Sequence, residues 1–188
     1  MPLGSDETKK LRALIGQMNW AATQTRPDVL FECCKLASKI KNATVADVLN
    51  TNKVLKKLHY DVKIKLPPLI DIKHLKFVVH SDASYANLDD GGSQGGYVIV
   101  LSDEHSNKLS PIAWQSKRII RVVKNTLAAE MQALVDAAES CYWLQRILNE
   151  VLGTEGCNIE CFITYSRIRG PDTSKWRTSP MRSQSETN

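Results

Sequence analysis

Two carboxylates occupy positions where their chemistry stands out from the surrounding pattern. Asp82 closes a short run of strand-forming residues, just before a polar stretch. On a helix, Glu130 lies three positions from Leu127 and four from Leu134, at the edge of an apolar stripe. A carboxylate turned toward a core is costly unless it is paired, hydrogen-bonded or bound to a metal. Each acid also has an ordinary explanation, because Asp is common at turns and the helix dipole favours acids in a first turn.

Together, the two acids predict a site for divalent cations. An acid at the end of a first strand and an acid early in the helix that follows the strands can meet at one edge of a sheet. Carboxylate oxygens are ligands that Mg²⁺ prefers. Two Mg²⁺ ions about 3.5–4 Å apart activate water and stabilise the leaving oxygen in phosphodiester hydrolysis. That chemistry requires further acids, because two carboxylates cannot hold and neutralise two divalent ions.

The elements that position these acids follow from the hydrophobic pattern. Helical spacing runs over 7–58, with an interruption at Arg26-Pro27-Asp28, where Pro27 suits the first position of a new helix, and a turn at 42–44. Pro67-Pro68 ends this segment. Strands are expected at 75–82, 97–101, 111–115 and 158–163, and a helix at 126–152. The apolar stripe expected on that helix consists of Leu127, Met131, Leu134, Ala138 and Cys141.

This order of elements predicts an α+β fold with a mixed sheet. Three closely spaced strands indicate an antiparallel meander, and a strand that follows a helical crossover is expected to lie parallel to a neighbour. We therefore expect a helical segment over 7–66, a sheet domain over 72–163, and a tail over 164–188. The tail is rich in Ser, Thr and Arg and has too few large apolar residues to form a core, so it is expected to be disordered.

Composition excludes several classes of protein. Of the 188 residues, 43% are hydrophobic and 24% charged, which is ordinary globular usage and argues against wholesale disorder. The longest apolar run, 97–101, is too short to cross a bilayer, and the first ten residues contain no apolar signal core. An odd count of five cysteines without framework spacing predicts reduced thiols and a cytoplasmic or nuclear protein that is not secreted. No membrane partner is expected.

Charge is divided unevenly along the chain. Residues 1–76 contain 14 basic and 7 acidic residues, whereas 77–188 contain 11 and 13. A basic segment joined to a slightly acidic one indicates a surface for a polyanion beside a site that uses carboxylates. A solvated, lysine-rich helix face explains the same composition.

Four motifs carry a family resemblance: S-D-A-S-Y-A-N at 81–87, G-G-S-Q-G-G-Y at 91–97, I-A-W-Q-S-K-R at 112–118 and T-L-A-A-E at 126–130. In this order and spacing they resemble the ribonuclease H domain at the end of copia-type LTR retrotransposon Pol polyproteins. Upstream, L-R-A-L-I-G-Q-M-N-W-A-A-T-Q-T-R-P-D at 11–28 and T-N-K-V-L-K-K-L at 51–58 resemble the end of the reverse transcriptase. The polymerase itself is not expected, because its paired aspartate motif does not occur in the chain.

The resemblance implies a ribonuclease H-like sheet and metal-dependent hydrolysis of the RNA strand in RNA–DNA hybrids. It implies that Asp82 and Glu130 are catalytic and hold Mg²⁺ or Mn²⁺. The partners it implies are an RNA–DNA hybrid or other nucleic acid, and the remaining Pol domains. The residues it places near nucleic acid are Ser81, Ser84, Gln115, Lys117, Arg118, Arg121 and Lys124. For the basic residues among them, a flexible solvated loop is an equal alternative.

The match to this family stops near residue 163. The family's third acid is expected directly after the fourth strand, where this chain has Ile163-Thr164-Tyr165-Ser166. The later helices, last strand and fourth acid of the family have no counterpart in 167–188, as after a reading-frame change or an aberrant exon. We therefore expect weak metal binding and little or no hydrolysis.

Two other functions remain open from the sequence. One is a non-catalytic nucleic-acid-binding module that uses Lys53, Lys56, Lys57 and the basic cluster at 117–124, with steep salt dependence and no metal requirement. The other is a translated relic of a decayed element without molecular function.

Overall fold

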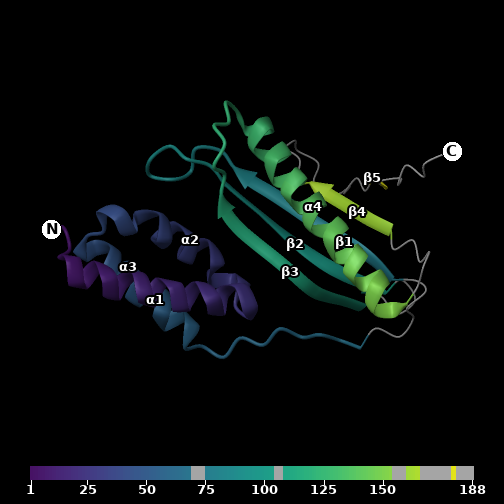
Figure 1. Cartoon of the computed structure of the whole chain (residues 1–188), viewed down its shortest axis with the longest axis horizontal. Coiled ribbons are helices and arrows are strands. Elements are labelled where there is room, and N and C mark those ends of the chain that lie inside the picture. Colours follow the sequence, from purple (N-terminus) through teal and green to yellow (C-terminus); the bar gives the residue numbers. More distant parts are fainter. Residues whose placement is uncertain (69–74, 104–107, 154–159, 166–178, 181–188) are drawn as a thin grey trace, which may run out of the picture. The chain divides into compact units, whose positions relative to one another are not determined.

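The computed structural model describes residues 1–68, 75–103, 108–153, 160–165 and 179–180. The chain divides into two compact units (Figure 1). The helical unit comprises Met1–Ile64 together with Gln115–Arg118, and the sheet unit comprises Lys65–Trp114 and Ile119–Asn188.

The helical unit follows the interruptions expected from the sequence. Its elements are α1 (Ser5–Gln24), the 3₁₀ turn η1 (Pro27–Val29), α2 (Leu30–Lys39), the 3₁₀ turn η2 (Ile40–Asn42) and α3 (Val45–Leu58). Pro27 is the first residue of η1, as expected. Thr44 begins α3 by exchanging hydrogen bonds with Asp47, which confirms the cap at the 42–44 turn. The core of the unit includes Leu11, Ile15, Met18, Ala22, Val29, Leu30, Cys33, Leu36 and Val54.

A buried arginine holds the end of α3 in this unit. Arg26 is only 7% exposed. Its guanidinium donates two hydrogen bonds of 2.9 Å to the carboxylate of Asp28. It also donates to the carbonyl oxygens of Lys57, Leu58 and Tyr60 at 2.8, 2.9 and 3.0 Å. The side chain therefore satisfies carbonyls at a helix C-terminus, which sequence analysis did not foresee.

The sheet unit is α+β, as expected. Its strands are β1 (Leu75–Ser84), β2 (Gln94–Asp103), β3 (Lys108–Arg118), β4 (Glu160–Tyr165) and β5 (Ser179–Pro180), in the spatial order β3-β2-β1-β4-β5. The first three strands form the antiparallel part of the sheet. β4 pairs with β1 in parallel after helix α4 (Thr126–Leu152), which confirms the expected crossover.

The first two strands are longer than the sequence pattern predicted. The Gly-rich stretch 81–96 contributes the end of β1 and the start of β2. Within it, Asp82 pairs with Gly96 and Ala83 pairs with Gly95. A glycine weakens the strand signal in a sequence, but here the backbone hydrogen bonds of the ladder decide the structure.

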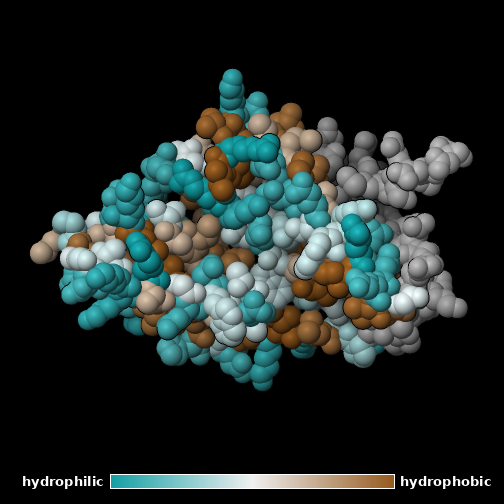
Figure 2. Space-filling model, viewed as in Figure 1, coloured by the Kyte–Doolittle hydropathy of each residue, from teal (hydrophilic) through white to brown (hydrophobic). Residues whose placement is uncertain are grey.

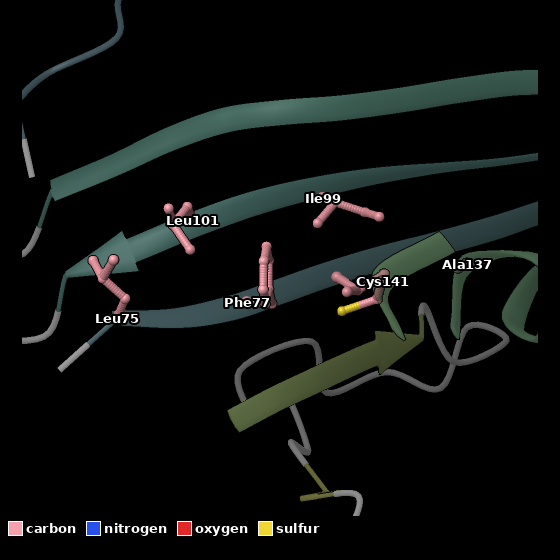
Figure 3. Packing of buried hydrophobic residues seen from close by; sticks show 7 residues of the cluster. Leu75, Phe77, Ile99, Leu101, Ala137 and Cys141 are labelled. Carbon is pink, nitrogen blue, oxygen red and sulfur yellow. The ribbon is translucent and has the colours of Figure 1, made fainter. Parts of the chain in front are cut away.

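The core of this unit lies between α4 and the sheet (Figure 3). The buried cluster consists of Leu75, Phe77, Val79, Ile99, Leu101, Ala137 and Cys141. Tyr97 packs against it, and its hydroxyl donates to the Ser140 hydroxyl at 2.8 Å.

The apolar stripe expected on α4 is wrong in part. Leu127 and Met131 are 61% and 50% exposed, whereas Ala129, Ala133, Ala137 and Cys141 are buried. Periodicity favoured the large residues for the buried face. In the structure small side chains face the sheet, and they allow the helix axis to approach it closely. Cys141 lies in the cluster, and Leu134 and Ala138 pack against it, as expected.

Two further expectations change. Cys141 is disulfide-bonded, so the prediction that all five cysteines are reduced is wrong, while Cys33 and Cys34 are free thiols. Ser179–Pro180 in the expected disordered tail forms the edge strand β5 against β4, a place where a proline without an N–H is tolerated. The rest of 166–188 lies outside the described residues. In the described part of the chain, every helix is too short or too polar to cross a membrane.

Candidate metal and nucleic-acid site

The two candidate acids lie on neighbouring elements of the sheet unit. Asp82 is exposed, two residues before the end of β1. Glu130 is the fifth residue of α4 and is partly buried. The start of α4 is fixed by Asn125, whose side-chain oxygen accepts a 2.8 Å hydrogen bond from the N–H of Ala128.

A glycine brings the first turns of α4 close to the strand ends. A Cβ atom added at Gly95 would lie 3.3 Å from the Cβ of Ala133 and 3.4 Å from a side-chain carbon of Ile119. Ala133 lies one helical turn after Glu130, and Gly95 pairs with Ala83, the neighbour of Asp82. The absence of a side chain at Gly95 therefore places the turn that carries Glu130 beside the end of β1.

The surroundings of Glu130 disfavour its charged form. The pKa of Glu130 is raised, first because partial burial disfavours the charged form and second because the negative charge of Asp82 opposes ionisation. The expected convergence of the two acids stays a prediction, which this charge effect and the close approach at Gly95 support. A bound cation would relieve this repulsion.

The donor set fits a single divalent cation better than a pair. Mg²⁺ is commonly held by one or two carboxylates, with water and phosphate oxygens completing its octahedron. Within the described residues no group of three or more His, Cys, Asp or Glu side chains is arranged to hold a metal ion. Tyr165 pairs with Ser81, one position before Asp82, at the place where the third acid was expected.

The two candidate serines differ in access. Ser84 ends β1 and is exposed, so it can reach a ligand at the strand end. Ser81 is buried, because alternation along the strand turns it away from the solvent that Asp82 faces. The expectation that Ser81 touches a substrate backbone does not fit this burial.

The candidate basic cluster is split between the two units. Gln115, Lys117 and Arg118 are the end of β3 and group with the helical unit. Arg121 and Lys124 belong to the sheet unit, in the connection 119–125 between β3 and α4, and both are exposed. Only Arg121 and Lys124 therefore share a unit with the two acids.

A tyrosine that sequence analysis passed over ties this connection to the strand end. The hydroxyl of Tyr85 donates to the carbonyl oxygen of Lys124 at 3.2 Å. At the other end of the connection, the N–H of Ile119 donates to the carbonyl of Ser93 at 2.9 Å. Tyr85 lies three residues after Asp82, so its place within the S-D-A-S-Y-A-N motif was the available signal.

Comparison with known proteins finds similarity to a Pol polyprotein. The chain is 23% identical, over 145 residues, to the retrovirus-related Pol polyprotein from transposon RE1 of Arabidopsis thaliana. The chain is a distant relative of a retrotransposon Pol polyprotein. The match covers 74% of this chain but only 9% of that polyprotein, so the chain corresponds to a small part of it.

The other comparisons add no family. No family model matches the chain. Endonuclease V from Bacillus subtilis is a solved structure with 15% identity, covering 68% of this chain and 58% of its own. Its TM-score of 0.25 is too low to show a common fold.

Proposed function

We propose that this chain is a ribonuclease H-like fragment of a copia-type Pol polyprotein that binds RNA–DNA hybrids and hydrolyses them weakly or not at all. The observation that carries the proposal is the pair of carboxylates at the junction of β1 and α4, where Asp82 raises the pKa of Glu130. The meander, the crossover helix, the parallel β4 and the similarity to a retrotransposon Pol polyprotein support it. In this proposal, the helical unit corresponds to the end of the reverse transcriptase.

Asp82 and Glu130 are the residues that would hold Mg²⁺ or Mn²⁺ in this site. The bound ion supplies Lewis-acid activation of water and stabilisation of phosphate charge. Glu130 must lose its proton to serve as a ligand, and its raised pKa makes that loss harder. Ser84, Arg121 and Lys124 would contact the sugar-phosphate backbone, which positions a duplex without reading its sequence.

Impaired hydrolysis follows from the ligand count. Two carboxylates leave a pair of divalent cations under-neutralised and loosely positioned. Tyr165 on β4 pairs with Ser81, the neighbour of Asp82. The ribonuclease H-like pattern requires a third acid at this position. Each missing carboxylate removes charge that would compete with the hydration shell of Mg²⁺.

The direct test is to incubate the full chain with a labelled RNA–DNA hybrid and either Mg²⁺ or Mn²⁺. We expect binding of the hybrid with little or no cleavage. Asp82→Asn and Glu130→Gln are the informative variants, and Glu139→Gln, an exposed acid further along α4, is the matched control. Robust cleavage that disappears in Asp82→Asn but persists in Glu139→Gln would show that two acids suffice. This result would contradict the proposal that hydrolysis is weak or absent.

A metal-independent nucleic-acid-binding module is the second candidate, favoured by the basic excess of residues 1–76. On α3, Lys53 and Lys56 are exposed, whereas Lys57 is paired with Glu32. The double variant Lys53→Gln/Lys56→Gln should weaken hybrid binding in a chelator and lower the salt slope by about 1.8. Binding that is flat from low to high salt would contradict this candidate.

A further inference from the structure

One cysteine in the core of the sheet unit is joined to another cysteine. Cys141 is disulfide-bonded and lies fully buried in the cluster between α4 and the sheet. Cys33 and Cys34, on α2 in the helical unit, are free thiols. The chain has two other cysteines, at 157 and 161. The partner of Cys141 is therefore one of these two.

The register of β4 favours Cys161 as the partner. Cys161 is the second residue of β4 and is level with Phe77 of β1 in the parallel pair. Phe77 belongs to the same buried cluster as Cys141 (Figure 3), and α4 contacts β4. Residues at one level of neighbouring strands share a face of the sheet, so position 161 is on the face that α4 covers. Residue 157 lies outside the described residues.

The fully buried positions of α4 carry small side chains. Ala129, Ala133 and Ala137 are buried, and an alanine removes less apolar surface from water than a large side chain does. Met131 and Trp143 are 50% and 63% exposed, and Figure 2 shows hydrophobic residues on the surface where Figure 1 places α4. A covalent bond to β4 therefore adds to a hydrophobic contact that is weaker than large side chains would provide.

We propose that Cys141 and Cys161 form a redox-sensitive crosslink that fixes α4 to β4 and opens when a dithiol reduces it. The two cysteines are 20 positions apart, and a disulfide stabilises a fold mainly because it restricts the unfolded chain. On its other side β4 meets β5, which is two residues long, so the pairing with β1 and the crosslink are what hold β4. The inference is independent of the proposed function, because it concerns a bond in the core and not a ligand.

The crosslink opens by thiol–disulfide exchange. A thiolate of the dithiol attacks one sulfur and breaks the S–S bond, and the second thiolate of the dithiol then resolves the mixed disulfide. The chain gains two electrons and two protons as two thiols, and the dithiol becomes a disulfide. Burial raises the pKa of the Cys33 thiol to about 11, so this thiol stays protonated near neutral pH and does not attack the crosslink.

The first test locates the bond in the full chain. The unreduced protein is digested with trypsin and Glu-C, and the joined peptides are identified by mass spectrometry. Cleavage after Glu155 and Glu160 separates residue 157, on peptide 156–160, from residue 161, on peptide 161–167. We expect the peptide 140–146, which contains Cys141, to be joined to 161–167. A bond to 156–160, or a free thiol at Cys141, would overturn the proposal.

The second test measures what the bond does. Dithiothreitol should lower the midpoint of thermal unfolding of the sheet unit by about 10 °C. Hydrogen exchange should become faster in β4 and in the second half of α4, whereas exchange in the helical unit should not change. Exchange is measured on the original chain, so this readout does not require a variant that folds.

Two variants and a control complete the design. Cys161→Ser and Cys141→Ala should unfold at the same temperature with and without dithiothreitol, because neither can form the bond. Cys34→Ser, in the helical unit, is the matched control and should keep the shift of about 10 °C.

The outcomes leave the proposed function to its own test. A mapped bond whose reduction changes neither the unfolding midpoint nor the exchange of β4 would contradict a crosslink that fixes α4 to β4. A shift with dithiothreitol that persists in Cys161→Ser would assign the effect to other thiols and would also overturn the proposal. Cleavage and binding of the hybrid enter neither measurement.

Discussion

The two units use charged side chains in opposite ways. In the helical unit, the buried guanidinium of Arg26 meets a carboxylate and three carbonyl oxygens. Its pKa is raised by the hydrogen bond to Asp28, and the pKa of Asp28 is lowered by the same contact. Ionisation and folding therefore reinforce each other there.

In the sheet unit, the surroundings of Glu130 oppose its ionisation. Glu130 is partly buried beside another acid, so its raised pKa marks a charge that the fold disfavours. A group that weakens a fold in this way is typical of functional sites, although structural networks also perturb pKa values. The contrast separates a contact that stabilises the protein from a carboxylate whose charge the fold disfavours.

The largest expected effect comes from removing the contacts of Arg26 in the helical unit. Arg26→Ala should lower the free energy of unfolding by about 3 kcal/mol, because it leaves charged and carbonyl partners unsatisfied. Chemical denaturation followed by circular dichroism measures the change. Arg12→Ala, at an exposed position on α1, is the control and should change stability by less than about 0.5 kcal/mol. A similar loss in both variants would contradict the role assigned to Arg26.

The second prediction concerns pH. Because the pKa of Asp28 is lowered, the stability from its contact with Arg26 is present above the ordinary Asp pKa and is lost as pH falls through the lowered value. Asp28 is partly exposed, so Asp28→Asn should cost only about 1 kcal/mol at pH 7. The difference between the two proteins should shrink in denaturation curves recorded below about pH 4. A constant difference across this range would show that the contact is not ionic.

Sequence patterns predicted those features whose signals are local. The breaks at Pro27 and Thr44, the helix from 126 to 152 and the parallel β4 were predicted, because proline, caps and periodicity act within a few residues. The convergence of Asp82 and Glu130 is inferred from topology and is supported by the raised pKa of Glu130, which partial burial and the charge of Asp82 cause. Their catalytic and metal-binding roles remain predictions.

The missed features depend on contacts between distant residues. The carbonyls that Arg26 binds lie 31 to 34 residues later in the chain, so no local pattern announces them. The buried alanines of α4 were missed because alanine contributes little to a hydrophobic pattern. They matter here because their small side chains allow the close approach of α4 to Gly95. The residues by which β1 and β2 exceed the expected strands were missed for a related reason, since their pairing is set by the neighbouring strand.

The third prediction is a gain in the free energy of unfolding, whereas the first is a loss. Glu130→Gln should raise the free energy of unfolding at pH 7 by about 0.5 kcal/mol, because it removes a charge that burial and Asp82 disfavour. Because the pKa of Glu130 is higher in the folded protein, the stability of the original chain is fully present below the pKa of glutamate in the unfolded chain. That stability is lost as pH rises through the pKa of Glu130 in the folded protein. The advantage of Glu130→Gln should therefore vanish near pH 4, where glutamate is largely protonated. Thermal unfolding of Glu130→Gln and of the control Glu139→Gln measures it.

The smallest expected effect tests whether the repulsion marks a cation site. With a dissociation constant near 10 mM, about 10 mM Mg²⁺ would stabilise the original chain by only about 0.4 kcal/mol. Glu130→Gln and Asp82→Asn should lose this increment, because each removes one of two carboxylate ligands, whereas Glu139→Gln should keep it. Matching the ionic strength with a monovalent salt separates specific binding from screening. An equal Mg²⁺ shift in all four proteins would mean that the ion acts on the surface generally, and the two acids would then be a pair of like charges without a ligand.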